Sequence, residues 1–265
     1  MAHIPKESGD GTAPVTIYGP GNHDMRSPSP LCLLRTKRDL ADLEAKPIPG
    51  VFLSPEEKDV TKIHVLMVGP AGTPYEGGFF HLFIECGGDY PMQAPSVRLL
   101  TTDAGRVQFH PHIYSNGRIL LGSSWTPVQS IGSLLASILS LLRADAYSVG
   151  NLSSEAYQEA IDRYNSYVQH ETLRVAVCDT VEACLQDNSA YPRGLAELII
   201  LQKFVGSYSR YKEIIEANLH LSGTEMKSFT GLVKGTFEYG TLLARLEDLL
   251  QRLKSKYGTN STGSV

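Results

Sequence analysis

The stretch from Gly69 to Trp125 decides the fold of this chain. It begins with GPAGTPYEGGFF at residues 69–80, continues with FHPHIYSNG at residues 109–117 and closes with WTP at residues 125–127. Proline and glycine punctuate it between short apolar segments, a pattern typical of strands joined by tight connections. The stretch therefore predicts a meander of short antiparallel strands.

Four segments in and just before this stretch have the composition of strands. They are Val51–Leu53, Lys62–Val68, Phe79–Cys86 and Ser96–Thr102. Side chains of a strand point alternately to its two faces, so Val65 and Met67 share one face of the second segment, and Phe80 and Leu82 share one face of the third.

Two capped helices are predicted on either side of the meander. Ser29, which precedes a proline, caps a helix that ends near Glu44. Thr126 also precedes a proline and forms a capping-box pattern with Gln129. Apolar residues with helical spacing follow it: Ile131, Leu134, Leu135, Ile138, Leu141 and Leu142. Helix, meander and helix predict an α+β domain in which helices cover one sheet.

From about Asn151 onward the pattern is entirely helical. Residues 154–186 read as one long helix or two, and residues 193–204 and 207–219 read as two more. A stripe of leucines then runs along residues 239–257, which is typical of a helix docked on its own domain. We therefore expect an all-helical C-terminal extension.

The chain divides into four predicted parts. Residues 1–26 and 255–265 are polar and are expected to be disordered tails. Residues 27–147 form the α+β core, a usual size for one domain, and residues 148–254 form the helical extension.

Composition excludes several classes of function. A net charge of −4 over 265 residues gives no general attraction to nucleic acid or to an anionic membrane. No apolar run is long enough to span a bilayer, and the N-terminus lacks the apolar segment of a signal peptide. The four cysteines form no C-x-x-C pair, so no metal or other cofactor is expected. Reduced thiols in a cytoplasmic or nuclear protein fit this pattern.

The motifs, in this order and at these distances, resemble those of the ubiquitin-conjugating enzymes over roughly residues 29–147. That family carries ubiquitin as a thioester on a cysteine, and the resemblance implies its UBC-like core. The segments HETLRVAVCD at residues 170–179 and PLCLLR at residues 30–35 are similar to the large Z-type members. This similarity implies that residues 148–254 are the C-terminal extension of that type.

The resemblance also identifies the position of the thioester cysteine, and a leucine occupies it. His110-Pro111 and the segment Asn116–Ile119 match the family's approach to the nucleophile, and the next residue is Leu120. Leucine has no nucleophilic atom, so this position cannot form a thioester. His112 stands where the family has an asparagine that stabilises the oxyanion or orients the active loop. The spacing from Leu120 to Trp125 is also shorter than in the family.

Partner surfaces follow from the same resemblance, which implies three partners: ubiquitin or a ubiquitin-like modifier, its activating enzyme and a ubiquitin ligase. Arg35 and Arg38 match basic positions of the first helix that meet the activating enzyme, and both are expected to be exposed. Met92, Pro127 and Val128 match the apolar patch that meets ligases, although Met92 fits ordinary core filling as well.

Two hypotheses about function remain open at this point. The first is a non-catalytic relative that keeps the fold and the partner surfaces. The second is an active Z-type enzyme whose catalytic segment is missing from this sequence, through an isoform or an erroneous gene model. Cys86, Cys178 and Cys184 are expected to be buried and inert rather than substitute nucleophiles. His110 is expected to be structural, since two histidines alone make a poor metal site.

Overall fold

The computed structural model describes residues 16–18, 27–122, 124–143, 155–186, 191–228 and 231–258. The predicted boundary at residues 147/148 and the tail beyond residue 258 lie outside these ranges. Among the described residues, no helix has both the length and the apolar character needed to cross a membrane.

A four-stranded antiparallel sheet forms the centre of the molecule. Its strands follow one another in chain order: β2 (Val51–Pro55), β3 (Lys62–Val68), β4 (Phe79–Glu85) and β5 (Ser96–Leu99). The register pairs Val65 with Leu82. The predicted meander and α+β class are confirmed, with strand ends that shift by one to three residues.

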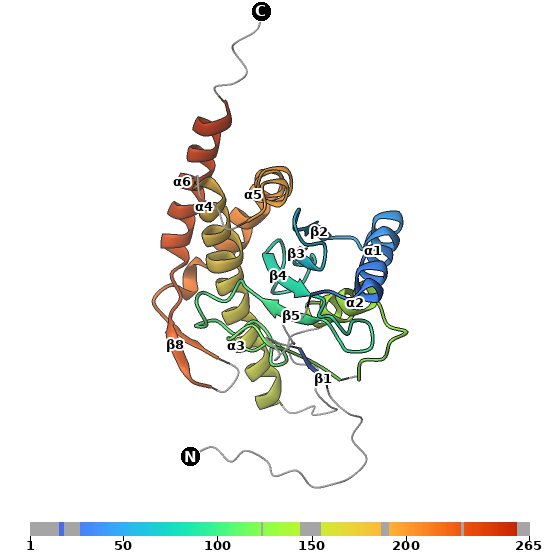
Figure 1. The fold of residues 1–265 in the computed structure, drawn as a ribbon. Coiled ribbons are helices and arrows are strands. Elements are labelled where there is room, and N and C mark those ends of the chain that lie inside the picture. The colour runs from blue at the N-terminus through green and yellow to red at the C-terminus, as the bar shows by residue number, and fades with distance from the viewer. Residues whose placement is uncertain are drawn as a thin grey trace, which may run out of the picture.

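Both faces of this sheet are covered, as Figure 1 shows. Helices α1 (Pro30–Ala45) and α2 (Ile131–Leu141) lie on one side, and the helices of the C-terminal extension lie on the other. On the extension side, the ring of His81 of β4 packs against that of Tyr191 with centroids 4.7 Å apart. Lys203 lies over the ring of Phe52 at 5.4 Å. The extension therefore packs directly on the outer face of the sheet.

Helix α1 begins as predicted, but α2 begins later. Ser29 caps α1 by accepting a hydrogen bond from the backbone of Cys32. For α2 the cap is Ser130, which forms a capping box with Ser133, and the predicted cap Thr126 is wrong. Thr126 and Gln129 do bond to each other, but they close the turn before the helix. The apolar face of α2 is buried as expected.

The extension contains fewer and longer helices than the sequence indicates. Helix α3 (Glu155–Glu171), the π-helical segment η1 (Thr172–Asp179) and α4 (Thr180–Leu185) follow one another without a break. In the same way η2 (Gly194–Leu201) continues into α5 (Gln202–Ala217), where two helices were expected. A short 3₁₀ turn, η3 (Leu219–Leu221), follows, and the last helix is α6 (Tyr239–Gly258). Helix α6 confirms the leucine stripe and extends into the predicted tail at residues 255–265.

Four short strands were not predicted. The hairpin of β7 (Glu225–Lys227) and β8 (Val233–Thr236) lies between α5 and α6, so the prediction of an all-helical extension is wrong. Strand β1 (Thr16–Tyr18) lies within residues 1–26, which were predicted to be disordered, and pairs with β6 (Ile119–Leu121). Strands of three or four residues are too short to show a clear alternation of apolar and polar side chains.

Candidate functional site

Leu120 lies in the middle strand of a small three-stranded arrangement. On one side its backbone N–H donates to the carbonyl of His112 at 2.8 Å, and Ile113 bridges to Ile119. On the other side β1 runs antiparallel to β6 and places Ile17 opposite Leu120. The Leu120 side chain is half-buried. The strand that carries the expected thioester position is therefore paired with another segment on each side.

Gly117 fixes the turn that leads into β6. Its φ of +84° lies in the left-handed region, and its carbonyl accepts a hydrogen bond from Leu99 at 2.9 Å. A Cβ atom at this position would lie 2.2 Å from the carbonyl oxygen of Leu99. Only glycine fits this backbone without strain.

Replacing Gly117 with alanine is expected to lower the free energy of unfolding by about 2–3 kcal/mol, because the new Cβ adds left-handed strain and a backbone clash. Urea denaturation measures the loss. Gly122→Ala is the matched control, since nothing lies within 4 Å of a Cβ there. Its effect is expected to stay within about 0.5 kcal/mol. Equal losses in the two variants would contradict this account of the turn.

His110 supports the loop rather than acting as a base. It is buried, and its Nδ1 accepts the backbone N–H of His112 at 3.0 Å. Burial, with the neighbouring His112, lowers the pKa of His110 to about 4. The imidazole is thus neutral near pH 7, which supports the structural role expected for it. Within the described ranges, no group of three or more His, Cys, Asp or Glu side chains could hold a metal ion.

None of the four cysteines is placed to act as a nucleophile. None of the four forms a disulfide and all four are buried. Cys32 donates its thiol to the carbonyl of Cys86 at 3.6 Å. Burial raises the pKa of both Cys86 and Cys178 to about 12. A thiol is a poor nucleophile until it ionises, so these cysteines are inert near neutral pH. They lie on α1, after β4, on η1 and on α4, and none of them belongs to the segment that carries Leu120.

The three residues predicted to contact a ligase are all exposed. The indole Nε1 of Trp125 donates to the carbonyl of Pro91 at 2.8 Å, which joins the loop after β4 to the loop before α2. Met92 is 65 % exposed and Val128 is 90 % exposed. Pro127, beside Val128, is exposed too. Core filling by Met92 is therefore excluded, and the two loops together present an apolar surface.

Arg35 is not exposed as expected, whereas Arg38 is. The guanidinium of Arg35 donates to the backbone carbonyls of Pro127 at 2.8 Å and Gln129 at 2.5 Å, and it pairs with Asp39 at 2.8 Å. Arg38 is exposed, and its Nε lies 3.9 Å from the carboxylate of Asp42. Of the two predicted positions, only Arg38 offers its charge to a partner. Arg35 holds the apolar loop in place.

The structure also identifies Asp39, which the sequence reasoning missed. Its carboxylate is 3 % exposed. It accepts hydrogen bonds from Arg35, from the hydroxyl of Tyr90 and from the backbone N–H of Ile131 at 3.1 Å. Through Asp39, helix α1 is joined to the loop after β4 and to the first turn of α2. The available signal was its spacing of four residues from Arg35.

These bonds explain why α2 begins late. In a helix that started at Pro127, the N–H of Ile131 would donate to the carbonyl of Pro127. Instead that N–H donates to Asp39, and the carbonyl of Pro127 accepts from Arg35. The Arg35–Asp39 pair therefore takes up both groups of one hydrogen bond that the first turn of such a helix would need.

The motif around Gly77 and Gly78 packs against the extension. Gly77 has a φ of +71°, and its carbonyl accepts the hydroxyl of Tyr211 at 2.8 Å. A Cβ on Gly78 would lie 2.6 Å from the side chain of Thr172. The role of these glycines is structural, because each allows a close approach between core and extension.

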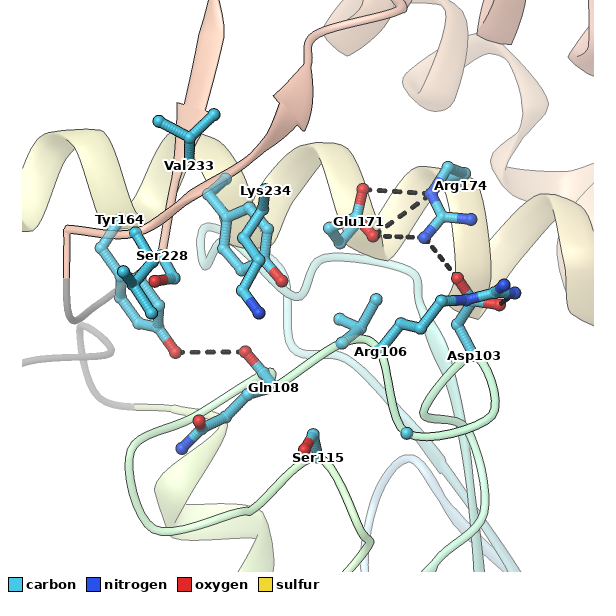
Figure 2. A pocket seen from close by; sticks show the side chains of 14 residues that line it. Asp103, Arg106, Gln108, Ser115, Tyr164, Glu171, Arg174, Ser228, Val233 and Lys234 are labelled. Atoms are coloured by element: carbon cyan, nitrogen blue, oxygen red, sulfur yellow. Dashed lines mark hydrogen bonds and ion pairs between the residues drawn. The ribbon is translucent and has the colours of Figure 1, made fainter.

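A polar cavity of about 690 Å³ lies where the core meets the extension (Figure 2). Ser115, from the loop that precedes Leu120, lines it together with side chains from α3 and β8. Arg174 bonds to Asp103 of the core at 2.7 Å and to Glu171 at 2.5 Å. The hydroxyl of Tyr164 donates to the carbonyl of Gln108 at 3.4 Å. These contacts fix α3 beside the loop.

Comparison with known proteins agrees with this architecture. The family model for ubiquitin-conjugating enzymes matches residues 35–174. Ubiquitin-conjugating enzyme E2 Z of Xenopus tropicalis is 36% identical over 271 residues, which cover 97% of this chain and 85% of that protein. The E2 Z protein of Homo sapiens is 37% identical over 267 residues, which cover 95% of this chain and 74% of that protein.

The chain belongs to the ubiquitin-conjugating enzyme family. Within that family it is most like the Z type. The match to the E2 Z proteins includes the extension. By contrast, the match to ubiquitin-conjugating enzyme E2 2 of Saccharomyces cerevisiae, at 34% identity, covers 58% of this chain and 84% of that protein.

Proposed function

We propose that this chain is a non-catalytic, Z-type-like member of the ubiquitin-conjugating enzyme family, which binds partners of the conjugation pathway without carrying the modifier. The observation that supports this most directly is Leu120 at the position that the family's motif assigns to the thioester cysteine. The burial and raised thiol pKa of Cys86 and Cys178 add to it, because no nearby thiol takes over.

The partners in this proposal are those of the family in general: ubiquitin or a ubiquitin-like modifier, the activating enzyme and a ligase. Arg38 supplies an exposed positive charge that would attract an acidic partner. Met92, Pro127 and Val128 supply the apolar surface for a ligase. Four cysteines that form no disulfide fit a reducing compartment, so we propose the cytoplasm or the nucleus as the location of this protein.

The test is a charging reaction with activating enzyme, ATP and the modifier, analysed on a gel without reductant. Because no thiol is available, no reductant-sensitive adduct is expected on this chain. An active family member in a parallel reaction is the positive control. An adduct that disappeared in a Cys86→Ser variant would overturn the proposal. The same mixture, analysed by size-exclusion chromatography, reports binding to the activating enzyme.

The alternative is an active Z-type enzyme whose catalytic segment is missing from this sequence. One observation favours it: apart from His112, the motifs on both sides of Leu120 match the family, while the spacing from Leu120 to Trp125 is short. Gradual loss of activity would be expected to alter the whole core more evenly. Sequencing of the transcript across codons 115–125 decides the matter. A longer message with a cysteine codon there would support the alternative.

A further inference from the structure

The pairing of β1 with β6 is the feature that the proposed function does not use. Thr16 pairs with Leu121, Ile17 with Leu120 and Tyr18 with Ile119, all antiparallel. The position that matches the family's cysteine therefore lies opposite the chain's own N-terminal segment. This segment is more than 100 residues away in sequence.

The hydrogen bonds of β6 show which of its backbone groups face β1. The N–H of Leu120 donates to His112, and the N–H of Tyr114 donates to Arg118, on either side of the Ile113–Ile119 bridge. In an antiparallel ladder, successive residues direct their N–H and C=O groups to opposite edges. The backbone groups of Ile119 and Leu121 therefore point away from this hairpin and toward Tyr18 and Thr16.

Without β1, these groups would form an open strand edge. Ile119 and Leu121 are both buried residues, and their backbone groups need hydrogen-bond partners. An open edge of this kind accepts an extended peptide by strand addition. The edge already holds one strand in a defined register, so its geometry fits an extended backbone that runs antiparallel to β6.

We propose that the outer edge of β6 is a strand-acceptor surface, and that residues Thr16–Tyr18 of the same chain occupy it. While the N-terminal segment is paired there, an extended peptide of a partner cannot bind to this edge beside position 120. A three-residue strand makes few hydrogen bonds, so a longer strand in the same register can displace it. This inference holds whether or not the chain carries a modifier.

Proline substitutions in the full chain test the pairing. Ile17 faces Leu120, whose backbone groups point to the other edge, so the N–H of Ile17 points away from β6. The double variant Thr16→Pro, Tyr18→Pro removes the two N–H groups that face β6, whereas Ile17→Pro removes one that does not. Hydrogen exchange of the Ile119 and Leu121 amides is expected to be at least tenfold faster in the double variant. In Ile17→Pro it is expected to change less than twofold.

A peptide of residues 12–20 tests the acceptor surface directly. It is expected to bind the double variant saturably and the parent at least tenfold more weakly, because the parent's edge is occupied. A peptide with proline at the positions of Thr16 and Tyr18 is expected not to bind. Equal binding to parent and variant, or unchanged amide exchange, would overturn the proposal. A strand-exchanged dimer of the parent would also overturn it, since the occupant would then be a second copy. Neither readout depends on thioester formation, so its result is separate from that of the charging reaction.

Discussion

Replacing Asp39 with alanine is expected to lower the free energy of unfolding by about 3–5 kcal/mol, the usual cost of breaking a buried ion pair on one side. The carboxylate accepts bonds from three donors: the side chains of Arg35 and Tyr90 and the backbone of Ile131. Tyr90 and Ile131 are fully buried, so their donors cannot turn to water in the variant. Each donor left without a partner adds its own cost.

Urea denaturation measures this loss, and the single tryptophan reports where it occurs. The ring of Trp125, the only tryptophan in the chain, lies 5.8 Å from that of Tyr90. Its emission is therefore expected to shift in Asp39→Ala before global unfolding. Asp42→Ala is the matched control, because Asp42 is exposed on the same helix and 3.9 Å from Arg38. An effect of Asp39→Ala no larger than that of the control, about 0.5 kcal/mol, would refute the role of Asp39.

Replacing Arg174 with methionine is expected to cost about 3 kcal/mol and to loosen the extension from the core. The side chain of Glu171 is 4 % exposed. In the variant it would lose Arg174 and keep the bond to His170, whose Nδ1 lies 2.9 Å from its Oε1. Arg174 itself is 31 % exposed, which places the cost at the lower end for a buried pair. Arg210→Met is the control, since Arg210 also bridges core and extension, through Glu76, but is largely exposed. Its loss is expected to be clearly smaller, because an exposed ion pair contributes little.

The pH dependence separates this ion-pair effect from lost packing. Burial alone would raise the pKa of both Glu171 and Asp103. For Glu171, hydrogen bonds from His170 and Arg174 outweigh burial and lower the pKa. For Asp103, hydrogen bonds from Arg106 and Arg174 do the same. A lowered carboxyl pKa stabilises the fold above the unfolded-state pKa, about 4.3 for Glu and 3.9 for Asp, and this contribution is lost as pH falls through the folded-state pKa. The difference in stability between parent and Arg174→Met is therefore expected to shrink as pH falls from 7 to 3. A constant difference would point to packing instead.

Local signals in the sequence were enough to predict the meander, α1 and α6. Each depends on neighbouring residues: a serine cap before a proline, alternating side chains in β3 and β4, and the leucine stripe of α6. The absence of a cysteine at position 120 could also be read directly, because it is a property of the sequence itself. The exposed loop residues Met92 and Val128 followed from the family resemblance.

The rest depends on contacts between distant parts of the chain. Arg35 was predicted to be exposed because only its own helix was considered, whereas its partners Pro127 and Gln129 lie more than 90 residues away. The same contacts delay the start of α2. The strand β1 has no pattern of its own and is defined by its pairing with β6. Local propensity cannot show such pairings.

The π-helical segment η1 changes the rotational phase of the long helix that contains it. A π turn closes with a bond from i to i+5 and so holds more residues than an α turn, which shifts the direction of every side chain beyond it. As a result, the continuous helix contacts two neighbours. Before η1, Glu171 lies beside the core loop. After η1, Glu182 bonds to Arg245 of α6 at 2.5 Å, and Figure 1 shows α4 and α6 close together. Loss of a single residue from η1 would turn α4 by about 100°. That rotation would carry Glu182 away from α6 and leave α3 where it is.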